Sequence, residues 1–221
     1  MSATNAAWEE QLIGFDARLT NAAEWSQERR EQYLLRVDSP VPVSVDPTVQ
    51  RSVFDLPEYD RPNYVGAFQN LWEELPELKA TLSSIKAAQT YQVLAFALVG
   101  RVTPSTPHPL AAAVDDRGYD PFTASRVPLP PVVPATRDTA WKLLGYDVAD
   151  RWGLSGLMNC GYKPDIVGAT RARFVGRLNA HHLFDAPEDA DEFRAHADAR
   201  VQEHAPFFVY GVWRVEDSGQ V

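Results

Sequence analysis

Hydrophobic and polar residues follow two periods along this chain of 221 residues, and the first of them is helical. Four hydrophobic residues near the N-terminus, spaced three or four apart, are Trp8, Leu12, Phe15 and Leu19. This spacing puts them on one helix face and predicts a helix there. A second helix is predicted from Ser26, which can cap it, to about Arg36. The alternating valines and three prolines of residues 37–49 predict an edge strand or an extended loop.

The middle of the chain predicts two short helices, a buried strand and a long connection. Residues 63–88 carry a helical stripe that Pro76 interrupts, so two helices should meet there. Residues Tyr91–Val102 are almost continuously apolar and predict a strand that is buried on both faces. Residues 104–134 hold eight of the 17 prolines, a density that excludes regular helix and central strands. They predict a proline-rich connection within one domain.

The C-terminal part predicts alternating strands and helices. Strands are predicted over Trp141–Val148 and 207–215, and helices over Pro164–Leu178 and 186–203. Asp185 and Glu188 form an Asp variant of the capping box at the start of the last helix. In the last strand, alternation places Phe208 and Tyr210 on one face and Phe207 and Trp213 on the other.

These elements mix strands and helices without a regular βαβ order. They predict an α+β fold: a single domain over residues 1–221 with an antiparallel or mixed sheet and helices on one or both faces. The triplet GYD occurs twice, at 118–120 and 145–147. It is too short to indicate an internal repeat, so none is predicted.

The composition excludes several classes of protein. The chain has 30 acidic and 21 basic residues and a net charge of −9, whereas sequence-independent nucleic-acid binders usually have a basic surplus. A single cysteine excludes an internal disulfide framework and a multi-cysteine metal site. The N-terminus lacks the regions of a signal peptide, and no apolar run is long enough to span a bilayer. We therefore expect a cytoplasmic protein that binds neither nucleic acid nor a membrane.

The sequence contains no complete catalytic or cofactor motif. Residues 153–157 come close to the serine-hydrolase elbow, but Leu157 stands where the second glycine is needed. Walker A, G-x-G-x-x-G and H-E-x-x-H patterns are absent, so we expect no cofactor and no metal. Cys160 could be a nucleophile with a histidine as its base. Its apolar, turn-rich surroundings instead favour a small buried hydrophobic residue.

The histidines could ligate a metal only with partners that the sequence does not specify. His181 and His182 lie near Asp185, but adjacent side chains on a helix point apart. His196 and His204 are eight residues apart, which is about 12 Å along a helix and too far for one metal. Surface or capping roles are favoured for these histidines.

Two groups of acidic residues are candidates for contact with a basic partner. The first lies in the proline-rich connection, where no helix explains the charge: Asp115, Asp116 and Asp120. The second opens the last helix, after Asp185: Glu188, Asp189, Asp191 and Glu192. Acids at a helix start also satisfy free N–H groups and the helix dipole, which favours a structural role for the second group. The nearby Arg171, Arg173 and Arg177 are expected to pair with these acids rather than bind phosphate.

Three C-terminal segments resemble a group of small bacterial proteins. The segments are LGYDVADRWGLSGLMNCGY (144–162), LNAHHLF (178–184) and ADARVQEHAPFFVYGVWRV (197–215). The group consists of immunity proteins that are encoded beside polymorphic or contact-dependent toxins. The resemblance implies a protein partner, and it assigns no site residue because these segments are fold-bearing. Residues 1–136 carry no such resemblance.

Resemblance and composition together predict a non-catalytic binding protein that neutralises a cognate toxin by occluding it. An acidic surface suits this role, because charge complementarity speeds association with a basic partner and rejects wrong partners. Two alternatives remain open at this point. One is a small cytosolic enzyme with a dispersed site that uses Cys160 or the histidines, and the other is a regulatory subunit of a bacterial assembly.

Overall fold

The computed structural model describes residues 7–20, 33–34, 42–46, 49–55, 71–85, 90–102, 119–120, 125–126, 138–150, 153–158 and 162–216. A four-stranded antiparallel sheet, ordered β1-β2-β6-β5, lies at its centre. The strands are β1 (Ala7–Leu19), β2 (Tyr91–Val102), β5 (Lys142–Asp150) and β6 (Phe207–Arg214). The described helices are α2 (Leu75–Ser84), α4 (Pro164–Phe174) and α5 (Pro187–Arg200), with short 3-10 turns η2 (Val53–Asp55) and η3 (Val175–Arg177). The predicted α+β fold is confirmed.

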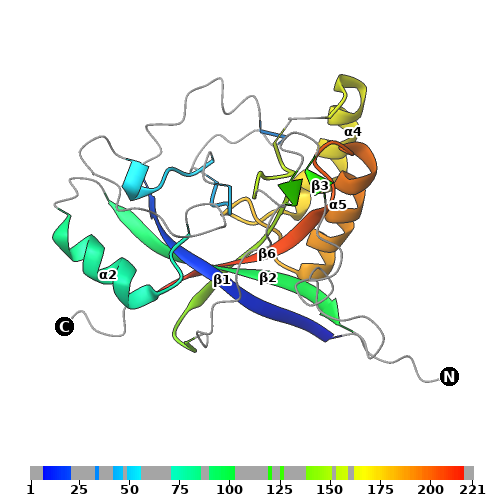
Figure 1. The fold of residues 1–221 in the computed structure, drawn as a ribbon. Coiled ribbons are helices and arrows are strands. Elements are labelled where there is room, and N and C mark those ends of the chain that lie inside the picture. The colour runs from blue at the N-terminus through cyan, green and yellow to red at the C-terminus, as the bar shows by residue number, and fades with distance from the viewer. Residues whose placement is uncertain are drawn as a thin grey trace.

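Helices α2 and α5 cover the same face of the sheet near its two ends (Figure 1). Leu78 of α2 shares a core cluster with Phe15 of β1, and Phe193 of α5 shares another with Phe207 of β6. The opposite face forms a third cluster, in which Val45 covers the sheet. Both faces are therefore buried against other parts of the chain. The predicted division of the aromatic residues of β6 between the two faces is confirmed.

The predicted N-terminal helix is wrong, because residues 7–19 form strand β1. The register between β1 and β2 shifts between Leu12 and Gly14, which is a β-bulge. A bulge inserts one residue into the alternation, so Leu12 and Phe15 end on the same face although they are three residues apart. This spacing imitates a helical period. Ile13 points to the other face, as strand geometry requires.

Three other segments of the N-terminal half depart from simple helix or strand. The helix predicted to end near Arg36 is wrong at Tyr33 and Leu34, where Tyr33 forms an isolated bridge with Met158. Residues 42–46 form a loop rather than a strand. Pro76 stands in the first turn of α2, so it marks the start of that helix. The helix predicted before it is wrong at residues 71–74, where Trp72 forms an isolated bridge with Phe15, and residues 63–70 lie outside the described residues.

The remaining C-terminal elements follow the sequence pattern. Strands β2, β5 and β6 are confirmed, and helix α4 continues as η3 to Arg177. Helix α5 is confirmed, but its capping box is wrong: Ala186 is the N-cap and no side chain caps the helix. In the proline-rich connection the structure describes two short strands, β3 (Tyr119–Asp120) and β4 (Ser125–Arg126), which pair with each other.

Candidate functional site

The predicted acids of α5 are engaged by other side chains of the protein. Glu192 Oε1 accepts a hydrogen bond from Arg173 at 2.5 Å, and its Oε2 accepts one from Arg177 at 2.8 Å. Arg177 also donates to Asp189. The expected pairing of Arg173 and Arg177 with these acids is confirmed. Arg171 instead donates to the backbone carbonyl of Leu34, so the same expectation is wrong for it.

The other two acids of this helix are also occupied. Glu188 accepts a hydrogen bond from the indole N–H of Trp8 at 2.6 Å, and Asp191 accepts one from Arg194 at 2.6 Å. Hydrogen bonds from Arg173 and Arg177 lower the pKa of Glu192. Exposed ion pairs of this kind contribute only about 0–1 kcal/mol each to stability. Each of these guanidinium groups also neutralises the charge of the acid that it binds.

The acids of the proline-rich connection are only partly described. Asp120 lies in β3, opposite Ser125 of β4, and Asp115 and Asp116 lie outside the described residues. Cys160 lies outside them as well, so its proposed roles stay predictions.

The histidines are divided among separate surroundings. His196 forms a hydrogen bond of 2.9 Å with Thr170 Oγ1 and stacks on Tyr162. His181 and His182 lie in the turn between η3 and α5, where burial lowers the pKa of both. Among the described residues no three His, Cys, Asp or Glu side chains are grouped as metal ligands.

His204 and Asp150 form a histidine–aspartate pair at hydrogen-bond distance. The His204 Nδ1 atom lies 3.0 Å from Asp150 Oδ2, and the Asp150 side chain is fully buried. The other Asp150 oxygen accepts the backbone N–H of Leu154 at 2.9 Å. A buried carboxylate that holds an imidazole in this way fixes its orientation, as it does in many general bases.

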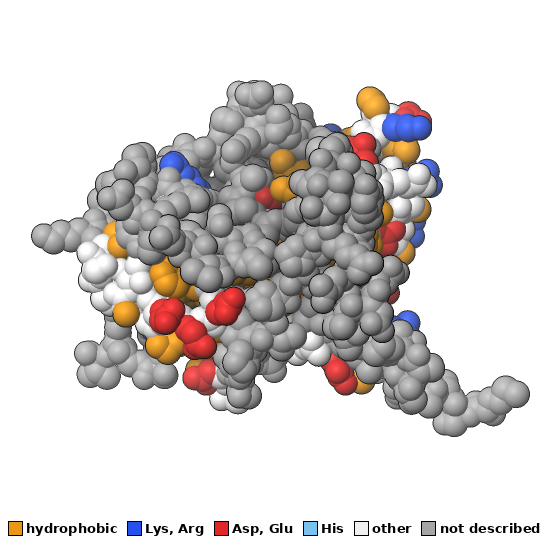
Figure 2. Space-filling model, viewed as in Figure 1, with side chains coloured by type: hydrophobic (Ala, Val, Ile, Leu, Met, Phe, Trp, Pro, Cys, Tyr) orange, Lys and Arg blue, Asp and Glu red, His pale blue; other side chains and the backbone are white. Residues whose placement is uncertain are grey.

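Three acidic side chains at the start of α2 were missed by the sequence analysis. Glu73, Glu74 and Glu77 are all exposed, and acidic side chains gather at this end of α2 in Figure 2. The described part of the chain gives none of them an ion pair. The sequence does contain a cue, which is three acids within five residues. The apolar stripe of the same segment predicted helices there, and the acids were not considered as a separate group. These three residues are called the α2 acids below.

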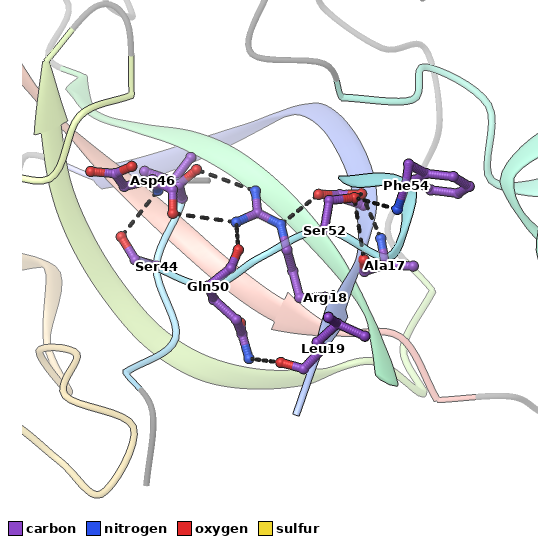
Figure 3. A network of polar contacts seen from close by, with 10 residues as sticks. Ala17, Arg18, Leu19, Ser44, Asp46, Gln50, Ser52 and Phe54 are labelled. Atoms are coloured by element: carbon purple, nitrogen blue, oxygen red, sulfur yellow. Dashed lines mark hydrogen bonds and ion pairs between the residues drawn. The ribbon is translucent and has the colours of Figure 1, made fainter. Parts of the chain in front are cut away.

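A second feature that the sequence did not reveal is a buried polar network on the sheet face opposite the helices (Figure 3). Arg18 of β1 is fully buried, with its Nε atom 2.5 Å from Asp16 Oδ2. Its Nη1 atom donates to the carbonyl of Gln50 at 2.8 Å, and its guanidinium lies over the ring of Phe96. These contacts tie residues 42–46 and 49–55 to the sheet.

Asp147 of β5, the outer strand at the opposite edge of the sheet from β1, binds residues 44 and 45. Its carboxylate accepts hydrogen bonds from Ser44, from the N–H of Val45 at 3.1 Å and from Ser155 at 3.2 Å. Burial, with a smaller contribution from the nearby Asp46, raises the pKa of Asp147 to about 6. Burial likewise raises the pKa of Asp16, although Arg18 opposes that shift. Because its acids bind donors of the chain itself, the network has a structural role. Asp16, Arg18, Asp147 and the residues that bind them are called the clasp below.

No family model, curated protein or solved structure matches the chain. No helix among the described residues is long and apolar enough to cross a membrane. Function is therefore inferred from the side chains and their surroundings.

Proposed function

We propose that this protein is a non-catalytic binding protein, an immunity protein that neutralises a cognate bacterial toxin by occluding it. The partner would present a basic contact surface, and the protein would act in the cytoplasm. The observation that carries the proposal is the contrast between its acidic groups. The acids of α5 are paired within the protein, whereas the α2 acids are exposed and have no ion pair in the described part of the chain.

Unpaired surface acids are the groups through which a protein attracts a basic partner. They act over several ångströms before contact, so they raise the association rate more than they lower the dissociation rate. The net charge of −9 extends the same field over the molecule. Asp115, Asp116 and Asp120 remain candidates for contact with the partner, and Glu188, Asp189, Asp191 and Glu192 rank below them because arginines or Trp8 already bind them.

The proposal is tested by co-expression with the product of the neighbouring toxin gene, measuring survival of the host and co-purification of the two proteins. The variant Glu73→Gln/Glu74→Gln/Glu77→Gln should protect less well and retain less toxin. A control variant, Glu9→Gln/Asp165→Asn/Glu203→Gln, removes the same negative charge from exposed positions elsewhere. Equal protection by both variants would exclude the α2 acids, and absence of any complex with the native protein would refute the proposed function.

An enzymatic alternative is favoured by one contact, the His204–Asp150 pair. The variant His204→Gln keeps a hydrogen-bonding side chain but cannot act as a general base near neutral pH. A binding protein with this change should still protect the host as well as the native protein does. Loss of protection with an unchanged melting temperature and an unchanged toxin complex would instead support catalysis.

A further inference from the structure

The two outer strands of the sheet share an unusual local structure. Each has a register shift at a glycine with positive φ: Gly14 in β1 has φ +156°, and Gly145 in β5 has φ +143°. A Cβ atom at Gly14 would lie 2.7 Å from Leu71 Cβ, and one at Gly145 would lie 2.7 Å from Leu183 Cβ. Both glycines therefore permit the close approach of a leucine to the bulge.

The residue after each glycine makes the same backbone bridge. Phe15 and Trp72 exchange two N–H···O bonds, both of 2.8 Å. Tyr146 and Phe184 exchange two, of 2.8 and 2.9 Å. In each case the partner is an aromatic residue that follows the packed leucine directly. The edge of each outer strand is thus covered in the same way.

The next residue is a buried aspartate, and the two aspartates share two kinds of donor, a backbone N–H and a serine hydroxyl. Asp16 accepts the N–H of the following residue at 2.8 Å and the hydroxyl of Ser52 at 2.8 Å. Asp147 accepts the N–H of the following residue at 2.8 Å and the hydroxyl of Ser155 at 3.2 Å. Each serine oxygen then accepts the N–H of the residue two positions further on, at 3.3 Å in both places.

The helices and inner strands continue the correspondence. Helix α2 begins three residues after Trp72, and α5 begins three residues after Phe184. Strand β2 begins seven residues after the end of α2, and β6 begins seven residues after the end of α5. Helix α5 has 14 residues and α2 has 10, a difference of about one helical turn. Both helices pack on the same face of the sheet.

The pairing between the inner strands β2 and β6 shows how the β1–α2–β2 elements are related in space to the β5–α5–β6 elements. Tyr91 and Phe207 open β2 and β6, so Phe96 and Val212 occupy equivalent positions. These two residues pair with each other. The flanking pairs Leu94↔Arg214 and Leu98↔Tyr210 exchange under the same equivalence. This is the pattern that a two-fold axis perpendicular to the sheet produces where it passes the Phe96–Val212 pair.

We propose that the chain is an internal duplication: residues 7–102 and 142–214 are two copies of one unit, fused and related by a half-turn about an axis between β2 and β6. Each unit consists of an outer strand with a glycine bulge, a serine that binds the buried aspartate, an aromatic bridge, a helix and an inner strand. The inner strands form the interface between the units. A repeat was not predicted because LIGFDA (12–17) and LLGYDV (143–148) share only Leu, Gly and Asp.

The two copies differ in the groups that bind their buried aspartates. Arg18, two residues after Asp16, binds that aspartate, whereas Ala149 stands at the equivalent position after Asp147. Ser44 and the N–H of Val45 supply the missing donors to Asp147. The segment of residues 42–46 belongs to the first copy but binds the aspartate of the second. It therefore breaks the symmetry and connects the two units.

The proposal is tested in the full chain with paired substitutions at equivalent positions. Gly14→Ala and Gly145→Ala should both lower the urea midpoint of unfolding, and by similar amounts, because both force a Cβ against a leucine at positive φ. Gly168→Ala and Gly176→Ala are controls, since their Cβ atoms would meet nothing within 4 Å. If either glycine variant fails to fold, the milder pair Ser52→Ala and Ser155→Ala gives the same comparison.

A crystal structure of the full chain provides the second, geometric test. Superposition of β1, Trp72, α2 and β2 on β5, Phe184, α5 and β6 should require a half-turn and align Gly14 with Gly145. Unequal effects within both substitution pairs, or a superposition that fails to align the two bulges, would overturn the duplication. Equal effects together with the half-turn would establish it.

Discussion

Asp147 and Asp16 show how one buried carboxylate can be stabilised in two ways. Asp16 has a cation, Arg18, beside it. The donors to Asp147 are the hydroxyls of Ser44 and Ser155 and two backbone N–H groups, all of them neutral. Neutral donors offset burial less completely than a cation does, so the pKa of Asp147 rises to about 6. The two aspartates should therefore respond differently to pH and to substitution.

The first prediction concerns the pH dependence of stability. Because the pKa of Asp147 is raised by folding, its contribution is most favourable below about pH 4 and is lost as the pH rises through about 6. The difference amounts to at most about 3 kcal/mol. Asp147→Asn should remove this pH dependence between pH 4 and pH 7, measured by urea unfolding. An identical pH profile for the native protein and the variant would show that Asp147 does not titrate in this range.

The second prediction concerns Arg18. Arg18→Met keeps the apolar stem over Phe96 but leaves the buried Asp16 without its cation. Breaking a buried pair in this way costs about 3–5 kcal/mol. Unfolding by urea should show that loss, while Arg173→Met, which removes an exposed pair, should cost less than about 1 kcal/mol. A comparable small cost at Arg18 would mean that the clasp contributes little to stability.

The elements that the sequence predicted correctly are those with local cues. Strand β6 has dense aromatic and β-branched residues, and α4 and α5 each begin with a proline in the first turn. Strand β1 was misassigned because its bulge changes the apolar period from two to three at Gly14. The buried network could not be predicted, since its donors and acceptors are up to about a hundred residues apart, as in the bond from Ser44 to Asp147.

The third prediction concerns the core beneath α5. Phe193 is fully buried, and its ring centroid lies 5.0 Å from that of Phe174 and 5.6 Å from that of Phe184. Phe193→Ala should cost about 3–5 kcal/mol, through lost burial and the cavity left behind. Val175→Ala is a suitable control because Val175 is 45% exposed. A thermal or urea unfolding curve that barely moves for Phe193→Ala would contradict this account of the helix.

Helices α2 and α5 both begin with acidic residues, but within the described residues the fold pairs only those of α5 with arginines. Glu77 and Asp189 each stand three residues after the N-cap of their helix. Arg177 binds Asp189, but the described part of the chain gives Glu77 no ion pair. Sequence alone gives both helices an acidic start and cannot show which acids the fold neutralises. That difference depends on where the fold places the arginines.

At the scale of the whole molecule, a negative field and a rigid two-sided sheet suit a protein that binds a basic partner through its surface. Helix α2 packs against the sheet through Leu78 and Leu82, and the three exposed acids lie at its start, at one end of the molecule (Figure 2). Such a surface should steer association electrostatically. Salt is therefore the variable that separates this mechanism from binding by apolar contact alone.

The central claim is tested most directly by association kinetics with the candidate toxin, measured by surface plasmon resonance from 0.01 M to 0.1 M salt. Over this range the Debye length falls from about 30 Å to about 10 Å, so steering should weaken. The account predicts that association of the native protein slows steeply with salt. It also predicts that Glu73→Gln/Glu74→Gln/Glu77→Gln flattens that dependence more than Glu9→Gln/Asp165→Asn/Glu203→Gln does. A salt-independent association rate, or equal slopes for the two variants, would contradict it.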